Sequence, residues 1–100
     1  MANLNMTVPH NLPEEEALRR IKNLFTELRE EQKGTIENVE EEWNGNTGRF
    51  GFSAKGFDLS GTIMVNSTGV EIDAELPFAV SLFKGAIKQV IADKAGELLK

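Results

Sequence analysis

The sequence predicts a two-layer α+β fold, in which one face of an antiparallel sheet is covered by two long helices. Apolar and polar residues alternate from Arg49 to Leu76, which is the period of strands with one buried and one solvated face. A long amphipathic segment lies on either side of that region. A chain of 100 residues has room for one modest core, so we expect a single domain over residues 1–100.

The first predicted elements are a strand and a helix. Residues 3–8 alternate between polar and apolar side chains, and Pro9 ends this strand. Pro13 is typical of the first turn of a helix, where its missing N–H is not needed. Apolar residues then recur at three- and four-residue steps until the stop signal Lys33-Gly34. We therefore expect one helix from Pro13 to Gln32.

Four strands should follow the first helix. The first of them is the least clear, with Val39, Glu41 and Trp43 on one side. The other three have a clean period of two and are separated by short turns rich in glycine and asparagine. Strands joined by short turns pair with their sequence neighbours, which predicts an antiparallel meander that ends at Pro77.

Residues 78–99 predict the second long helix. Its core stripe should consist of Ala79, Val80, Phe83, Ile87, Val90, Ile91 and Leu98. Phe78, Leu82 and Ala86 widen the apolar arc beyond that stripe. The wide arc predicts either deep burial under the first helix or contact with a partner helix, a second copy or an apolar particle.

The complete order is β-α-β-β-β-β-α, and each helix has one apolar stripe to cover the apolar face of the sheet. This order resembles the TATA-binding-protein-like fold and also a small helix-grip domain. In the first of these layouts the outer face of the sheet would hold DNA.

Charge and composition limit the classes of partner. The net charge is −5, which disfavours nucleic acid because phosphate backbones repel an acidic chain. We see no signal peptide and no apolar run of the ~20 residues that a membrane helix needs. The chain has no cysteine, which is compatible with a reducing cytoplasm.

The outer face of the sheet should be acidic. Its expected residues are Glu40, Glu42, Arg49, Ser53, Lys55, Asp58, Ser60, Thr62, Met64, Glu71, Asp73 and Glu75. This face lacks an aromatic row on which bases could stack. It is either a solvated surface or a dimer surface in which acidic rows meet Arg49 and Lys55 of a second copy.

Few residues suggest chemistry. His10 is the only histidine, and we expect its ring to tie down the strand–helix connection rather than to act as a general base. Glu71, Asp73 and Glu75 share one side of a strand and should be solvated. Glu41 falls on the apolar side, where a bulge that turns it outward is the favoured explanation.

Several short motifs follow one another in a fixed order. They are Val8-Pro9-His10-Asn11-Leu12, Trp43-Asn44-Gly45, Gly61-Thr62-Ile63, Val70-Glu71-Ile72 and Leu76-Pro77. Their order and spacing, together with the chain length, resemble the bacterial polyhydroxyalkanoic acid system family over nearly the whole chain. The resemblance implies a bacterial cytoplasmic protein linked to polyester storage granules. It implies no reaction, catalytic residue, cofactor or metal.

We therefore expect a non-enzymatic accessory protein that binds other proteins or an apolar surface. The candidate ligand or interaction residues are His10, Trp43, Phe78, Leu82 and Ala86. For Trp43, a place in the core itself is the favoured alternative. The partners would be a second copy, granule-associated proteins or the granule surface. The alternative is a small helix-grip carrier that holds an acyl chain or another apolar ligand between the sheet and the last helix. A cavity of ~300 Å³ or more at that place would favour the carrier, whereas a closed core would exclude it.

Overall fold

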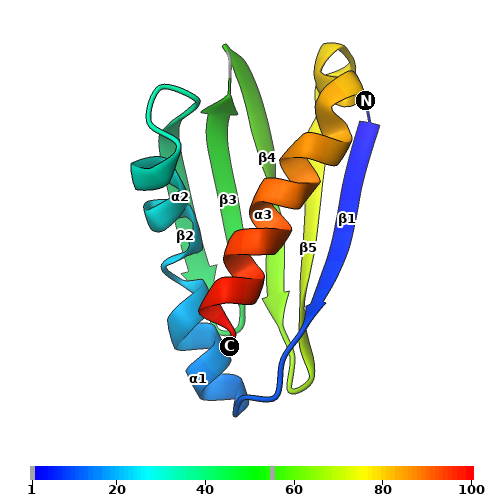
Figure 1. The fold of residues 1–100 in the computed structure, drawn as a ribbon. Coiled ribbons are helices and arrows are strands. Elements are labelled where there is room, and N and C mark those ends of the chain that lie inside the picture. Colours follow the sequence, from blue (N-terminus) through cyan, green and yellow to red (C-terminus); the bar gives the residue numbers. More distant parts are fainter. Residues whose placement is uncertain (1, 55) are drawn as a thin grey trace.

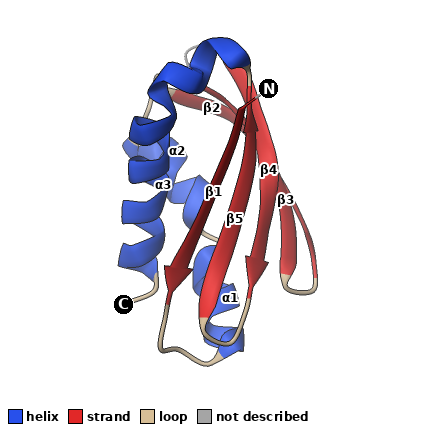
Figure 2. Cartoon of the chain, turned by 90° about the vertical axis from the view of Figure 1, so that its right-hand side faces the viewer, coloured by secondary structure: helices blue, strands red, loops and turns tan. Residues whose placement is uncertain are grey.

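The computed structural model describes residues 2–54 and 56–100, with the backbone alone described for Ala2. Its elements in chain order are β1 (Ala2–Pro9), α1 (Glu14–Ile21), α2 (Leu24–Glu31), β2 (Ile36–Asn44), β3 (Thr47–Ala54), β4 (Phe57–Val65), β5 (Gly69–Leu76), the 3₁₀ helix η1 (Phe78–Phe83) and α3 (Lys84–Leu98). The sheet order is β1-β5-β4-β3-β2, with every neighbouring pair antiparallel (Figure 1). The helices form a second layer on one side of the sheet (Figure 2). The predicted α+β fold class is confirmed.

The core lies between these layers, as the alternation predicts. Phe50, Ile63 and Ile72 on the inner face are 5%, 1% and 0% exposed. The Phe25 ring of α2 stacks on Phe50 with 4.3 Å between centroids and lies 5.5 Å from Phe52. The predicted outer-face residues are exposed or half-buried, except that Lys55 lies outside the described residues.

The prediction of one continuous helix from Pro13 to Gln32 is wrong, because the helix is interrupted at Lys22 and Asn23, between α1 and α2. The N–H of Asn23 donates to the carbonyl of Arg20 at 3.1 Å, an i to i−3 bond that tightens the end of α1. Ile21 and Leu24 on either side of the break are both buried. The apolar stripe therefore passes through the break, and its spacing gives no sign of it.

The prediction of one α-helix over residues 78–99 is also wrong at its start. The N–H of Val80 donates to the carbonyl of Pro77 at 2.9 Å, and the 3₁₀ geometry continues to the end of η1. A 3₁₀ helix has about 3.0 residues per turn instead of 3.6, which changes the side chains that face the sheet. Val80 is buried as expected, but Ala79 is exposed and Phe83 is 54% exposed.

β2 contains a bulge that the alternation alone does not locate. The β2–β3 register shifts between Glu37 and Glu40, and Asn38 has a φ of 54°. Ile36 and Val39 are three residues apart, a spacing that would put them on opposite faces of a regular strand. The extra residue of the bulge lets both face the core. The favoured explanation for Glu41 is wrong, because it pairs with the inward-facing Phe50 and is half-buried.

Two glycines make room for aromatic rings on the inner face. A Cβ at Gly61 would meet the backbone of β5 and would lie 2.8 Å from Cζ of Phe50. A Cβ at Gly48 would lie 2.8 Å from the Trp43 ring. The small residues therefore let the rings lie flat across neighbouring strands.

Candidate functional site

An apolar pocket lies on the helical side of the sheet, between α3 and the β2–β3 half. Its volume is about 240 Å³. Phe52 and Ala54 contribute the sheet wall, Val80 and Phe83 come from η1, and Ile87 comes from α3. Gln32 and Thr35 supply the polar side chains in the lining. This volume is below the ~300 Å³ at which known ligand sites begin, so the pocket suits a short apolar group.

A patch of exposed apolar side chains borders this pocket on η1. Phe78 is 80% exposed, Leu82 is 89% exposed and Phe83 is 54% exposed. Phe83 belongs to both features, because it also lines the pocket. We call Phe78, Leu82 and Phe83 the η1 patch. Ala86, the third residue of the predicted wide arc, is exposed on α3 and lines the pocket.

The charge around the η1 patch differs from that of the rest of the chain. Residues 76–92 contain Lys84 and Lys88 and no acidic residue, whereas the whole chain has a net charge of −5. A carboxylate is costly to move from water onto an apolar surface. This segment therefore has no carboxylate that would lose its water against an apolar surface.

His10 is not in this site, and both of its ring nitrogens have backbone partners. It is 7% exposed, and the N–H of Leu12 donates to its Nδ1 at 3.1 Å. A neutral imidazole that accepts at Nδ1 carries its hydrogen on Nε2, which therefore donates to the carbonyl of Asn66 at 2.8 Å. His10 thus ties the β1–α1 connection to the β4–β5 turn.

Replacing His10 by Ala is expected to lower the free energy of unfolding by about 1–3 kcal/mol, because a buried N–H and a buried carbonyl lose their partners. His10→Asn should lose less, since its side-chain oxygen can still accept from Leu12. Urea denaturation of the three proteins measures the difference. Equal stabilities of the wild type and His10→Ala would contradict the structural role.

Trp43 lies outside the pocket, at the other end of β2. Its indole N–H donates to Oε2 of Glu41 at 3.0 Å, and Nζ of Lys22 lies 5.7 Å from the ring centroid. The indole N–H provides the half-buried Glu41 with a hydrogen-bond partner. Trp43 therefore packs at the margin of the core and does not line the apolar pocket.

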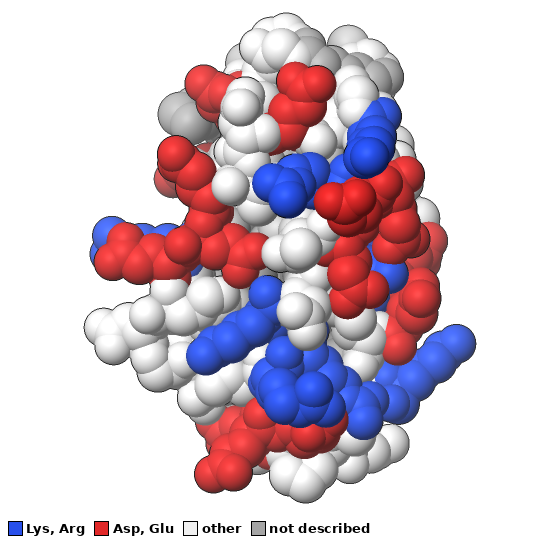
Figure 3. Space-filling view, turned by 90° about the vertical axis from the view of Figure 1, so that its left-hand side faces the viewer, with Lys and Arg blue, Asp and Glu red and all other residues white. Residues whose placement is uncertain are grey.

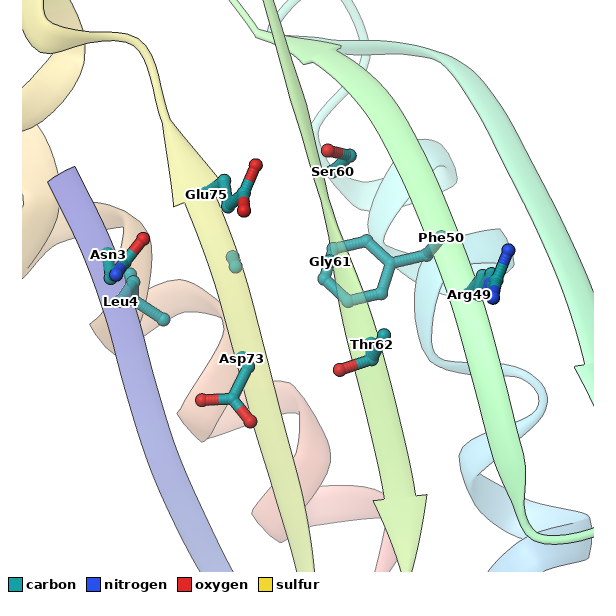
Figure 4. A pocket seen from close by; sticks show the side chains of 10 residues that line it. Asn3, Leu4, Arg49, Phe50, Ser60, Gly61, Thr62, Asp73 and Glu75 are labelled. Atoms are coloured by element: carbon teal, nitrogen blue, oxygen red, sulfur yellow. The ribbon is translucent and has the colours of Figure 1, made fainter. Parts of the chain in front are cut away.

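A second hollow of about 460 Å³ lies on the outer face of the sheet around Gly61 (Figure 4). The Phe50 ring lies across Gly61, and Ser60, Thr62 and Asp73 are among the polar residues around it. A side chain at Gly61 would point toward Phe50 on the inner face, so the outer hollow does not depend on the missing side chain. Within residues 2–54 and 56–100, no cluster of three or more His, Cys, Asp and Glu side chains is placed to bind a metal.

The carboxylates of Glu71, Asp73 and Glu75 are exposed on that outer face, as expected. The side-chain amide of Asn5 donates to Asp73, and that of Asn66 donates to Glu71 at 3.1 Å. These contacts are local to the sheet surface. Asp73 and Glu75 line the outer hollow, and Glu71 does not.

Lys94 is a buried cation that the sequence analysis does not single out. It is 7% exposed, and its ammonium lies 3.1 Å from Glu27 and 3.6 Å from Glu97 and also contacts Glu31. Acidic and basic side chains gather on the face formed by α1, α2 and β2 (Figure 3). The hydrogen bond to Glu31 raises the pKa of Lys94 above its ordinary value, and the bond to Glu27 adds to this, while burial opposes it. The cation joins α3 to α2 beside the pocket.

Lys94→Met is expected to remove a pH-dependent part of the stability. The folded pKa lies above the unfolded one, so this contribution is complete below the ordinary lysine pKa of about 10.4 and is lost as the pH rises through the folded value. The difference in free energy of unfolding between the two proteins should therefore be constant up to about pH 10 and shrink as the pH rises further. A difference that stays constant above about pH 10 as well would show that the effect is packing alone.

The patterns in the sequence singled out some of the residues of the pocket and the η1 patch. The wide apolar arc indicated Phe78, Leu82 and Ala86, and these three are exposed around the pocket. Phe57, which is 39% exposed and lines the pocket, was missed because it belongs to a regular strand pattern. Lys94 was missed because a lysine on a helix is ordinarily solvated. Among the described residues, no helix has the length and apolar character to cross a membrane.

Comparison with solved structures identifies the fold. The chain is similar to Ara h 8.0201, with a TM-score of 0.56, 13% identity, and 98% of this chain and 97% of that chain covered. It is also similar to the di-domain ARO/CYC BexL from the BE-7585A biosynthetic pathway, with a TM-score of 0.51, 8% identity, and 99% and 50% covered. TTHA0849 from Thermus thermophilus aligns with a TM-score of 0.45, 15% identity, and 98% and 92% covered. At these identities the likeness concerns the fold alone, and of the two predicted folds it is the helix-grip fold.

Sequence comparison gives the family. No curated protein shows significant similarity to the chain. A family model described as "Putative polyhydroxyalkanoic acid system protein" matches residues 4–99. That range includes both β-sheet edges, the pocket and the η1 patch. The chain therefore belongs to this polyhydroxyalkanoic acid system family.

Proposed function

We propose that this protein is a non-enzymatic, cytoplasmic accessory protein of polyester storage that binds the granule surface through the η1 patch. The observation that carries the proposal is the exposure of Phe78 and Leu82, at 80% and 89%. Membership in a polyhydroxyalkanoic acid system family supports the choice of the apolar polyester as the surface to be bound. His10, the only histidine, supports a non-enzymatic role because both ring nitrogens are engaged by the backbone.

The energetics of the η1 patch agree with reversible binding. Covering one large apolar side chain contributes about 1.5–3 kcal/mol, and Phe78 and Leu82 are both almost uncovered in the free protein. Lys84 and Lys88 flank the patch, and their alkyl chains can lie along an apolar surface while the ammonium groups remain in water. An apolar face bordered by lysines is typical of segments that lie on an interface without crossing it.

Co-pelleting tests this function directly. Purified protein is mixed with protein-free polyhydroxyalkanoate particles, and the fraction that sediments is measured against particle concentration. Saturable binding that persists at high salt is expected, because the attraction is apolar rather than electrostatic. Protein that remains in the supernatant at every particle concentration would contradict the proposal.

The apolar pocket favours a second candidate function, which is to hold a short acyl chain between α3 and the sheet. The specific observation is a volume of about 240 Å³ lined by apolar side chains from η1, α3 and three strands. The fold similarity does not supply the ligand, so the lining itself is the argument. A chain of this kind would enter tail first and keep its carboxylate at the exposed mouth.

Ala86→Trp is expected to separate the two candidate functions. Ala86 is exposed and lines the pocket, so an indole at this position can fill the pocket without disturbing the core. Titration with a short-chain fatty acid, followed by NMR shifts at Val80 and Ile87, should show binding to the wild type and at least roughly tenfold weaker binding to the variant. Unchanged affinity would exclude this pocket as the acyl site.

A further inference from the structure

β1 forms one edge of the sheet, and that edge has few of the features that normally prevent pairing with another strand. The strand of 8 residues contains no charged residue, and its register with β5 is unbroken. The opposite edge, β2, contains four glutamates and a register shift between Glu37 and Glu40. Charges, bulges and prolines are the usual protection of edge strands, and β1 has only Pro9 at its end.

The hydrogen bonds show which backbone groups of β1 face the free edge. The N–H of His10 donates to the carbonyl of Thr68 at 3.0 Å, and this pair continues the β1–β5 register. Bonded and non-bonded pairs alternate along an antiparallel ladder, so the even-numbered residues of β1 bond to β5. The N–H and C=O groups of Asn3, Asn5 and Thr7 therefore point away from β5, in the plane of the sheet and toward its open edge. Figure 2 looks toward this edge, and no other helix or strand of residues 2–54 and 56–100 covers it.

We propose that two copies of this chain associate through β1, in antiparallel pairing about a twofold axis at Asn5. Asn5 then lies opposite Asn5 of the second copy, and Asn3 lies opposite Thr7. Every free N–H and C=O of these three residues finds a partner in this register. A register shifted by one residue would bring inner side chains against outer ones. A register centred on Met6 would place Asn3 opposite Pro9, which has no N–H to donate.

A second copy fits this edge better than an unrelated strand because the edge is self-complementary. Twofold antiparallel pairing presents the same surface on both sides of the interface. Leu4, which is 0% exposed, would lie opposite Met6 of the second copy, so the apolar layer continues across the interface. The chain has a net charge of −5, yet this pairing brings no pair of carboxylates together along the two β1 strands.

The dimer would also place the η1 patches of the two copies on the same side of the joined sheet. The value of this arrangement rests on the proposed function, whereas the dimer itself does not. The twofold axis of an in-sheet pairing stands perpendicular to the sheet, so both helical layers face one way. The two η1 segments, each following the end of β5 that pairs with the start of β1, lie toward opposite ends of the interface. Two linked patches bind an extended surface more tightly than one.

Asn5→Lys is the sharpest test of this interface. In the monomer the new ammonium lies beside Asp73, the present partner of Asn5, so the fold is not expected to suffer. In the dimer two ammoniums lie directly opposite each other, which should weaken association by roughly tenfold or more. Ser60→Lys adds the same charge to the same face beside Glu75 of β5, but on an interior strand, and should leave association unchanged.

Sedimentation equilibrium across a concentration series measures the mass against the 11.1 kDa of one chain. A wild-type dimer that Asn5→Lys dissociates and that an equal mixture of Asn5→Lys with Asn5→Asp restores supports the proposal. A monomer at all concentrations, or a dimer that is insensitive to Asn5→Lys, would overturn it.

Residue-resolved amide exchange of the wild type decides the register without any variant. The amides of Asn3, Asn5 and Thr7 should gain protection as the concentration rises, while those of Leu4 and Met6 are protected throughout. Protection of the first three that appears only after another granule protein is added would assign the edge to a foreign strand and overturn self-pairing.

Discussion

Leu82→Glu is expected to weaken binding to polyhydroxyalkanoate particles by roughly 100-fold, because the apolar contact of one large side chain is lost and a carboxylate must be desolvated. Leu82 is 89% exposed, so its substitution removes no core contact and the folded state should be as stable as the wild type. Phe78→Glu should behave in the same way. The measurement is the fraction that co-pellets with particles, with thermal unfolding as the check on folding.

Thr26→Glu is the matched control for this prediction. Thr26 is exposed on α2 and the substitution adds the same single charge, but far along the chain from the η1 patch. Its particle binding should equal that of the wild type. If Leu82→Glu and Thr26→Glu bind equally well, the η1 patch is not the contact surface; if both bind equally weakly, net charge rather than apolar contact governs the association.

Gly61→Ala is expected to lower the free energy of unfolding by about 3 kcal/mol, near the upper end of what overpacking a core costs. The added methyl group would lie 2.8 Å from Cα of Ala74 and 2.8 Å from Cζ of Phe50 and would also meet the carbonyl of Asp73. Two of these atoms are backbone, so the strands themselves must separate. Chemical denaturation measures the loss, and near-ultraviolet circular dichroism reports the displaced Phe50 ring.

Gly51→Ala provides the control, one strand away and in the same sheet. A Cβ at Gly51 meets only the carbonyl of Leu59, at 3.6 Å, which is ordinary contact. Alanine also restricts the unfolded chain more than glycine does, so this variant should be equal to the wild type or more stable by about 0.4–1 kcal/mol. Similar losses at the two positions would indicate a general intolerance of side chains in β3 and β4 instead of a local collision.

Acid stability should depend on Glu16. Hydrogen bonds from Arg19 and then from Arg20 lower the pKa of Glu16 to about 2. The folded pKa is below the unfolded one, so the contribution of these contacts is present above the ordinary glutamate pKa and is lost as the pH falls toward 2. Arg20 also donates to the carbonyl of Leu98 at 3.3 Å, so Glu16→Gln should loosen the end of α3 in amide-exchange measurements.

The periodic parts of the chain were predictable because burial on one face leaves a period of two or of 3.6 in the sequence. Phe50, Ile63 and Ile72 could thus be assigned to the inner face without a structure. The break at Asn23 and the 3₁₀ geometry of η1 leave no such mark, because the apolar spacing is almost the same with and without them. The bulge at Asn38 shifts the phase by one residue, and only the pairing with β3 resolves it.

The site could be predicted only in part, for a related reason. The apolar arc of the last segment identified Phe78 and Leu82 as unusual, but whether they lie under the first helix or in solvent depends on the packing of three elements. Trp43 could be placed on the apolar side of its strand, as a residue of a ligand cavity or of the core. The structure places it at the margin of the core, at the end of β2 away from the pocket, with Nζ of Lys22 5.7 Å from its ring centroid.

By itself, the sequence determined the fold class, the sides of β1, β3, β4 and β5 that enter the core, and the family to which the chain is similar. These follow from local periodicity and from the spacing of motifs, which each residue and its near neighbours specify. Only the tertiary structure decided that Phe78 and Leu82 remain in solvent, that Lys94 is buried among glutamates and that the edge of β1 is free. Those properties depend on which segments far apart in the sequence pack together. A side chain or strand edge is exposed only if no such segment covers it, and local periodicity does not report this.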